Sequence, residues 1–137
     1  MAFVHRVRVR YSECDAQGVV FNGQYLFLYD VALTELFREA IGPYDEMVEN
    51  GADLVVAEAR LRYLAGARFD DELDIELPIA KLGTTSMTVT PRFRVDGRDM
   101  VEGEVRHVFI EPGTGSKREI PDDVRRALEP YAAAGAR

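Results

Sequence analysis

The chain has 137 residues, enough for one domain with a sizeable core, and its net charge of −7 repels nucleic-acid phosphates and anionic membrane surfaces. Its single cysteine, Cys14, excludes an intramolecular disulfide and zinc sites built from several cysteines. There is no run of about 18 apolar residues for a membrane span and no signal-peptide core near the N-terminus, so we expect one cytoplasmic domain over residues 1–137.

The first expected element is a strand over residues 3–11, because apolar or aromatic side chains alternate there with arginines. The arginines at positions 6, 8 and 10 are expected on the solvated face of that strand. Residues 12–18 are small or polar and predict a loop, in which Gly18 supplies backbone freedom.

A long helix is expected over about residues 22–41, where apolar residues recur at spacings of three and four. Asn22 can serve as its N-cap, and Gly42 followed by Pro43 is a stop signal. The first half of the helix, residues 25–29, is apolar on all sides. Because such a helix must be covered on most sides, we expect a sheet wrapped around it and a partner subunit.

Four more strands are expected after the helix, and their clean alternation predicts antiparallel strands with one solvated face. Pro91 indicates an edge or a bulge, and the pair Asp96 and Gly97 is typical of a hairpin turn. A short helix is expected to begin at Pro121, with acidic residues at its positive end. The predicted fold is therefore α+β, with a five-stranded antiparallel sheet, one long helix and a short C-terminal helix. The four strands are expected at residues 55–63, 73–79, 87–95 and 101–109.

The loop between the first strand and the helix places the carboxylate of Asp15 close to a helix N-terminus. The backbone N–H groups at that end are unpaired and partly positive, so they can hold the oxygen of a polarised carbonyl. A carboxylate beside them can attack the carbonyl carbon or activate a water molecule. This combination suits acyl transfer, although an aspartate in this place is more often a helix cap.

Residues 11–25, Tyr-Ser-Glu-Cys-Asp-Ala-Gln-Gly-Val-Val-Phe-Asn-Gly-Gln-Tyr, resemble the signature of the 4-hydroxybenzoyl-CoA thioesterase family of hotdog proteins. Further segments match the family in the same order, at residues 62–73, 82–86, 103–109 and 120–121. The resemblance covers nearly the whole chain. It implies a hotdog fold and hydrolysis of acyl-CoA thioesters without a metal or cofactor, coenzyme A being part of the substrate. It also implies a homodimer or a homotetramer, with the site at the subunit interface.

The resemblance assigns roles to individual positions. Asp15 falls on the catalytic aspartate, and the backbone N–H groups of Asn22 and Gly23 fall on the helix start that polarises the thioester carbonyl. Asp30 falls on the position whose acidic side chain meets the far hydroxyl of the substrate in 4-hydroxybenzoyl-specific members. The remaining substrate-binding positions are Tyr11, Gly18, Val19, Val20 and Tyr25.

The chain departs from the family pattern in two places. Many bacterial relatives carry a histidine where this chain has Asn22, whose amide cannot relay a proton. The basic cluster that some members use for the CoA phosphates is replaced by the neutral residues 83–85. Phosphate contacts are then expected from Lys81, Arg62, Arg68 or backbone donors.

Four residues have a structural interpretation beside a functional one. Asp30 is an isolated charge on an apolar stretch, so it either pairs with an arginine of the sheet or faces a pocket. Cys14 is expected to be a small buried side chain rather than a nucleophile, and His107 a core or interface histidine. His5 and Asp15 alone do not make a metal site.

The sequence therefore predicts a thioesterase acting on acyl-CoA or acyl-carrier-protein thioesters, with Asp15 as nucleophile or general base. A hotdog dehydratase is one alternative, but it needs a histidine paired with an acid, and no histidine lies in the loop or helix start. A non-catalytic protein that binds acyl thioesters on the same fold is the other. The identity of the acyl group stays open.

Overall fold

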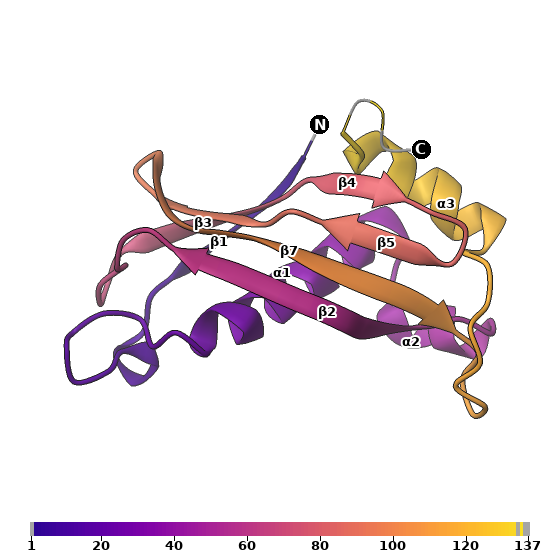
Figure 1. Ribbon diagram of the computed structural model, residues 1–137, viewed down its shortest axis with the longest axis horizontal. Helices are drawn as coiled ribbons and strands as arrows, with labels where there is room; N and C mark the ends of the chain where they lie inside the picture. Colours follow the sequence, from indigo (N-terminus) through magenta and orange to yellow (C-terminus); the bar gives the residue numbers. More distant parts are fainter. Residues whose placement is uncertain (1, 134, 136–137) are drawn as a thin grey trace.

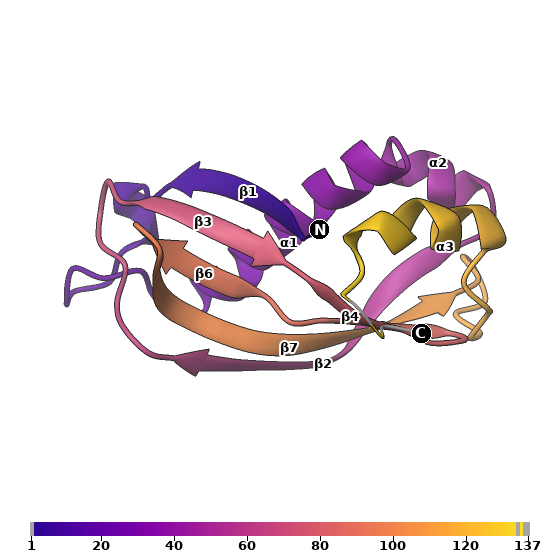
Figure 2. The same ribbon diagram turned by 90° about the horizontal axis from the view of Figure 1, so that it is seen from above.

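The computed structural model describes residues 2–133 and 135 of the chain. Within them, one antiparallel sheet of seven strands curls around the long helix α1 (Gln24–Ala40), and the short helix α3 (Asp122–Leu128) lies beside β4 (Figures 1 and 2). The predicted α+β architecture is confirmed. The strands are β1 (Phe3–Arg8), β2 (Asp53–Tyr63), β3 (Glu72–Leu77), β4 (Ile79–Leu82), β5 (Ser86–Val89), β6 (Arg92–Val95) and β7 (Arg98–Ile110).

The long strand β7 organises the sheet. One of its edges pairs with β2, and the other pairs with β6 along its first half and with β5 along its second half. From β6 the sheet continues through β3 to β1, and from β5 it continues to β4. The polar loop that follows β1 lies at the same end of the molecule as the end of β2 (Figure 1).

The difference between five predicted and seven observed strands comes from two prolines. Pro78 separates β3 from β4, and Pro91 separates β5 from β6. A proline has no N–H to donate, so it interrupts a hydrogen-bonded ladder. The two breaks lie next to each other in the sheet. Thr90 donates its N–H to the carbonyl of Pro78, with an N···O distance of 3.0 Å. The five-strand pattern is thus preserved, with two strands each creased in the middle.

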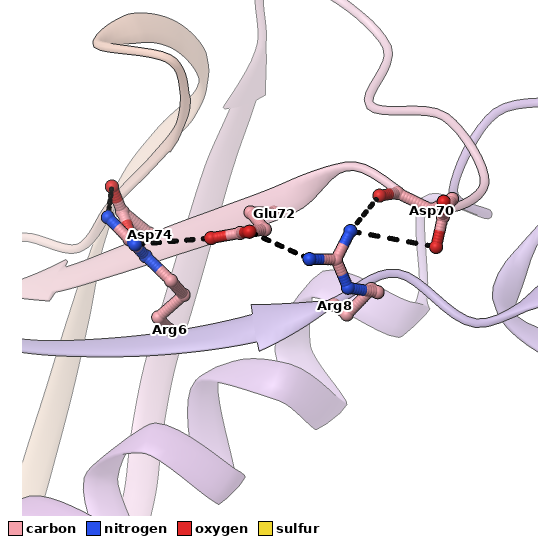
Figure 3. A network of polar contacts seen from close by, with 5 residues as sticks. All are labelled: Arg6, Arg8, Asp70, Glu72 and Asp74. Carbon is pink, nitrogen blue, oxygen red and sulfur yellow. Dashed lines mark hydrogen bonds and ion pairs between the residues drawn. The ribbon is translucent and has the colours of Figure 1, made fainter.

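Strand β1 ends at Arg8, three residues earlier than predicted, because the chain turns into the 3-10 helix η1 (Tyr11–Glu13). The arginines of β1 lie on the solvated face, as expected. Figure 3 shows that they meet carboxylates of β3: Arg6 Nε lies 2.7 Å from Asp74 Oδ1, and Arg8 Nη2 lies 2.7 Å from Glu72 Oε1. These cross-strand ion pairs match the register of the two strands.

The start of α1 differs from the prediction. Helix α1 begins at Gln24 with Gly23 as its N-cap, and no side chain caps it, so the N-cap role expected for Asn22 is wrong. The backbone performs the capping instead. Gln24 donates its N–H to the carbonyl of Phe21 (2.9 Å), and Tyr25 donates to the carbonyl of Asn22 (3.4 Å).

One side of α1 faces the sheet and is buried, whereas Leu26 and Phe27 on another side are 40% and 56% exposed. Within one chain, the apolar side chains at the start of α1 are therefore only partly buried. The buried residues of α1 are Tyr25, Leu28, Tyr29, Ala32, Leu33, Leu36 and Phe37.

Helix α2 (Tyr44–Glu49), which follows the stop signal after α1, was not predicted. It has six residues and buries only Met47, so it carries no apolar periodicity that a sequence pattern could show. No helix in the described residues is long and apolar enough to cross a membrane.

The predicted hairpin turn and the predicted start of the C-terminal helix are both confirmed. Asp96 and Gly97 have φ angles of 50° and 77° and connect β6 to β7 in a tight hairpin, in which Val95 pairs with Arg98. The C-terminal helix α3 has Pro121 as its N-cap and acidic residues, Asp122 and Asp123, in its first turn.

The core contains one buried polar pair. The hydroxyl of Tyr29 on α1 and Nε2 of His107 on β7 lie 2.7 Å apart and share a hydrogen bond. Both residues are 1% exposed. The expectation that His107 is a satisfied core histidine is confirmed, and burial lowers its pKa to about 4.

Strand β2 is the least covered element of the sheet. It pairs with β7 on one edge only, and most of its eleven residues are exposed, including Val55 (41%) and Val56 (52%). Alternation predicted that Val55, Ala57 and Ala59 would face a core, yet all three are exposed in the single chain. A long free edge with exposed apolar side chains is a ready template for pairing with another chain.

Candidate active site

The loop after β1 is folded back on itself as a narrow turn. Asp15 donates its N–H to the carbonyl of Val19 and accepts one from the N–H of Gly18, both at 2.9 Å. Gly18 has a φ of +78°, which explains the glycine at this position. The Gln17 N–H donates to Oδ1 of Asp15 (2.8 Å), so one carboxylate oxygen is fixed by the turn. Among the described residues, the other oxygen has no donor.

Hydrogen bonds hold this turn to η1 and to the connection between β2 and β3. The carboxylate of Glu13 is 4% exposed and accepts hydrogen bonds from the backbone N–H of Arg10 (2.7 Å) and from its guanidinium (2.9 Å). Val20 donates its N–H to the carbonyl of Ala67 (2.8 Å). The backbone at Gly66 lies so close to the side chain of Val19 that a Cβ on Gly66 would lie 2.7 Å from Cγ1 of Val19. Asp15 therefore lies in a turn whose conformation is fixed by hydrogen bonds and close packing.

The start of α1 presents backbone donors beside this turn. Gln24 and Tyr25 use their N–H groups in the backbone cap, but the N–H groups of Asn22 and Gly23 have no acceptor within the part of the chain that the structure describes. Free N–H groups at a helix start carry partial positive charge and suit an anionic or polarised oxygen. These two N–H groups lie at the position to which the family resemblance assigns carbonyl polarisation, and that role stays a prediction.

A pocket of about 430 Å³ opens between the turn, the start of α1 and the end of β2. It joins a carboxylate to a mainly apolar and aromatic lining, a composition typical of small-molecule sites. Its lining residues are Asp15, Gln17, Val19, Val20, Asn22, Tyr25, Tyr63, Leu64, Ala65 and Gly66.

A larger hollow of about 510 Å³ lies over β2, β6 and β7. Arg62, one of the cations considered for CoA phosphates, lines it, but it lies 3.6 Å from Glu102 in an ion pair. Arg60 in the same hollow pairs with Glu104 (3.1 Å). None of the predicted catalytic or acyl-binding residues lines this hollow. The pocket of about 430 Å³ is therefore the better candidate for the active site, although it is smaller.

Tyr25 forms the floor of the candidate pocket. Its side chain is 2% exposed, and its ring meets those of Tyr63 (centroids 5.8 Å apart) and Phe93 (5.2 Å) edge-on. Its hydroxyl accepts a long hydrogen bond of 3.5 Å from the N–H of Ala67. Burial raises the pKa of Tyr25 and keeps the hydroxyl neutral, so it contributes shape rather than charge.

The structure brings most of the predicted site residues together. Gly18 and Gly23 belong to the turn and the helix start that frame the pocket. Five of the predicted residues line it directly: Asp15, Val19, Val20, Asn22 and Tyr25.

Two predicted residues lie outside this lining. Tyr11 is 80% exposed and packs edge-on against Phe69, with centroids 6.0 Å apart. Asp30 lies on an exposed side of α1 and forms no ion pair with any described residue, so the arginine partner that was one expectation is absent. Partial burial raises the pKa of Asp30.

Sequence reasoning did not single out Tyr63 or the residues after it, although they supply one wall of the pocket. Tyr63 lies on the predicted inward face of β2, where an aromatic residue is ordinarily assigned to the core. The hydroxyl of Tyr63 donates to the carbonyl of Asn22 (3.1 Å), forty-one positions away in the chain. The only available indication was that residues 62–73 belong to a segment of the family resemblance.

The single cysteine and the two histidines are not among the residues that line the pocket. Cys14 is half-buried, with Sγ 3.8 Å from the carbonyl of Arg10, and the two histidines lie on β1 and β7. Arg68 forms no ion pair in the described chain, and its Nη1 would lie 3.8 Å from a Cβ on Gly18. The described residues contain no group of three or more potential metal ligands.

The comparisons with known proteins agree on one class of enzyme. The model of the thioesterase-like superfamily matches residues 9–128. The acyl-CoA thioester hydrolase YbgC of Escherichia coli is 31% identical over 119 residues, which cover 86% of this chain and 89% of the relative. The 1,4-dihydroxy-2-naphthoyl-CoA hydrolase of Nostoc punctiforme is 28% identical over 130 residues, covering 94% and 88%. A solved gentisyl-coenzyme A thioesterase superposes with a TM-score of 0.83 at 26% identity, covering 92% and 99%.

Proposed function

The chain belongs to the thioesterase-like superfamily and is a thioester hydrolase with the hotdog fold, and we propose that Asp15 and the start of α1 form its catalytic centre. The observation that carries this proposal is the pocket lined by the Asp15 carboxylate, by Asn22 at the helix start and by an apolar wall, next to two backbone N–H groups that have no acceptor among the described residues. Hydrolysis of a thioester needs each of these: a base or nucleophile, a donor to the oxyanion, and a place for the acyl chain.

Asp15 suits the role of base because its two oxygens differ. Oδ1 is held by the Gln17 N–H, and Oδ2 is free of donors in the described chain. As general base, Asp15 removes a proton from water while the water oxygen attacks the carbonyl carbon. The C–S bond then breaks, and the departing thiolate takes the proton that Asp15 carries.

As nucleophile, Asp15 attacks the carbonyl carbon itself, and the loss of thiolate leaves a mixed anhydride that water hydrolyses. A single turnover in heavy-oxygen water tests for the nucleophilic route. Heavy oxygen found in the side chain of Asp15 by mass spectrometry identifies this route, because the label enters Asp15 only when water attacks the aspartyl carbon of the anhydride. Label confined to the acid product is expected for the general base and also for an anhydride that water attacks at its acyl carbon.

The N–H groups of Asn22 and Gly23 are the proposed donors to the tetrahedral oxyanion. They need no side chain, which fits the presence of asparagine where many relatives have histidine. Asn22 cannot relay a proton, and no histidine lines the pocket, so Asp15 is the proposed carrier of the transferred proton. The absence of a pocket histidine also disfavours the dehydratase alternative.

The substrate class is proposed from the relatives, whose names refer to CoA thioesters. We take acyl-CoA as the substrate and carrier-protein thioesters as the alternative. Arg68, exposed beside the turn at Gly18, is the proposed phosphate contact nearest the pocket. The tyrosine and valine lining is compatible with aromatic and short aliphatic acyl groups, so a panel of both is the informative screen.

A homodimer is proposed from the free edge of β2. The strand ends at Tyr63, which lines the pocket, so a second copy paired along β2 would close the open side of the site. Exposed Leu26 and Phe27 on α1 supply further apolar surface for such a contact. The predicted homotetramer would require a second surface in addition to this one.

The central test is Asp15→Asn, assayed by CoA thiol release across the acyl-CoA panel. The amide keeps an oxygen for the Gln17 N–H, so the turn and the melting temperature are expected to hold while kcat falls about 10²-fold or more. Asp45→Asn, an exposed aspartate on α2, is the matched control and should keep wild-type turnover. Wild-type turnover in Asp15→Asn would refute the catalytic assignment, and tight acyl-CoA binding without any turnover in the wild type would favour the non-catalytic alternative.

A further inference from the structure

The peptide group that joins Asn22 to Gly23 has contacts of different kinds on its two sides. Its N–H, belonging to Gly23, has no acceptor among the described residues and is one of the two oxyanion donors proposed above. Its carbonyl, belonging to Asn22, accepts a hydrogen bond from the hydroxyl of Tyr63 at 3.1 Å. Tyr63 comes from the end of β2 and is itself part of the pocket wall.

A hydrogen bond to a peptide carbonyl strengthens the N–H of the same peptide as a donor. The carbonyl oxygen accumulates negative charge, the C–N bond gains double-bond character, and the N–H becomes more positive. Such polarisation along hydrogen-bond chains strengthens each bond by roughly 10–30% in condensed-phase estimates. The only other donor to the Asn22 carbonyl among the cap bonds is the N–H of Tyr25, at a weaker 3.4 Å.

The geometry around Tyr63 favours this arrangement over a chance surface contact. Its backbone is paired with Val101 of β7, and its ring is braced edge-on by the buried ring of Tyr25, with centroids 5.8 Å apart. The side chain is 50% exposed in the single chain, and acyl-CoA in the pocket would remove water from the hydroxyl. The hydrogen bond would then act in a drier environment at the moment of reaction, where it is stronger.

We propose that Tyr63 is a positioning residue that orients and polarises the peptide between Asn22 and Gly23, so that the Gly23 N–H stabilises the oxyanion more strongly. This role rests on the proposed function of the helix start. It predicts an effect on the transition state, in which the carbonyl oxygen is charged, and little effect on the bound thioester, in which the oxygen is nearly neutral.

The test is Tyr63→Phe, which keeps the ring in the pocket wall and removes only the hydroxyl. We expect kcat to fall about three- to tenfold with KM within about twofold of wild type. This fall in kcat is smaller than the fall of about 10²–10³-fold that follows the complete removal of an oxyanion-hole donor. Tyr131→Phe is the matched control, because it removes a hydroxyl bonded to Glu39 at the surface, away from the pocket, and should leave both constants unchanged.

A second readout is independent of turnover. In the substrate-free protein, the backbone ¹⁵N resonance of Gly23 is expected to move upfield in Tyr63→Phe, because the preceding carbonyl has lost its donor, and to stay in place in Tyr131→Phe. Thermal unfolding of each variant checks that the fold is kept. An unchanged kcat in a folded Tyr63→Phe protein, or a loss carried entirely by KM, would overturn the proposal.

The result also separates this inference from the catalytic assignment on which it rests. Loss of turnover in Asp15→Asn combined with wild-type kcat in Tyr63→Phe leaves the catalytic centre in place and removes only the role of Tyr63. Wild-type turnover in Asp15→Asn would instead remove the catalytic role of Asp15, while a lowered kcat in Tyr63→Phe would still support the role of the helix start.

Discussion

Acidification is expected to destabilise the protein through the buried pair of Tyr29 and His107. Burial lowers the pKa of His107 to about 4, against about 6.5 for an exposed histidine. Between these values the unfolded chain binds the proton and the native chain does not, so stability is complete above about pH 6.5 and declines as the pH falls toward 4. Linkage with these two pKa values gives a loss of about 2–3 kcal/mol by pH 4.5.

The assay is denaturant unfolding at fixed protein concentration between pH 7.5 and 4.5, comparing the wild type with His107→Gln. The glutamine side chain can still bond the Tyr29 hydroxyl but does not titrate, so the difference in unfolding free energy between the two proteins should shrink or reverse as the pH falls. Taking the difference cancels the carboxylates, which titrate in both proteins. His5→Gln on β1 is the control and should follow the wild type. A pH-independent difference between wild type and His107→Gln would refute the reasoning.

Three further changes probe the site and the proposed dimer. Gly66→Ala places a Cβ 2.7 Å from Val19; displacement of the Asp15 turn should lower kcat/KM about tenfold to a hundredfold, and unchanged kinetics would show that the turn adapts. Val56→Lys puts a charge on the free edge of β2 and should shift sedimentation toward the 15.4 kDa single chain, whereas an unaltered dimer would move the interface elsewhere. If the position of Asp30 meets the acyl group, as the family resemblance implies, Asp30→Leu should improve apolar acyl-CoAs and weaken hydroxylated ones by about 1–3 kcal/mol. The melting shift should be small, because Asp30 forms no ion pair with a described residue, and unchanged selectivity would exclude Asp30 from acyl recognition.

The fold was largely predictable because its strands alternate in character and its turns carry strong local signatures. Asp96 and Gly97 specify a hairpin on their own, and the helix start and stop are marked within a few residues. The interruption at Pro91 was expected as an edge or a bulge, whereas the break at Pro78 was not foreseen, because the alternation of apolar residues continues across it. Helix α2 escaped prediction because it buries a single residue, Met47.

The candidate site was predictable where it is local. Residues 15–25 form a contiguous turn and helix start, so their chemistry can be recognised from one short segment. The wall formed by Tyr63 depends on β2 returning to the same end of the molecule, which is a property of the topology. The backbone cap at Gly23 also follows from the three-dimensional path of the chain, since the sequence offered Asn22 as an equally good side-chain cap.

The breaks at Pro78 and Pro91 divide one side of the sheet into two panels that contact different helices. One panel, of β1, β3 and β6, lies against the helix that carries the site, and Phe93 of β6 touches Tyr25 at the pocket floor. The other panel, the β4–β5 hairpin, is tied to α3 through the guanidinium of Arg125, which donates to the carbonyl of Gly83 at 2.6 Å. The two panels are joined through β7, which pairs with both β5 and β6. Because α3 is bonded to the β4–β5 hairpin whereas Tyr25 packs against β6, substitutions around α3 are expected to change the melting temperature more than the acyl preference.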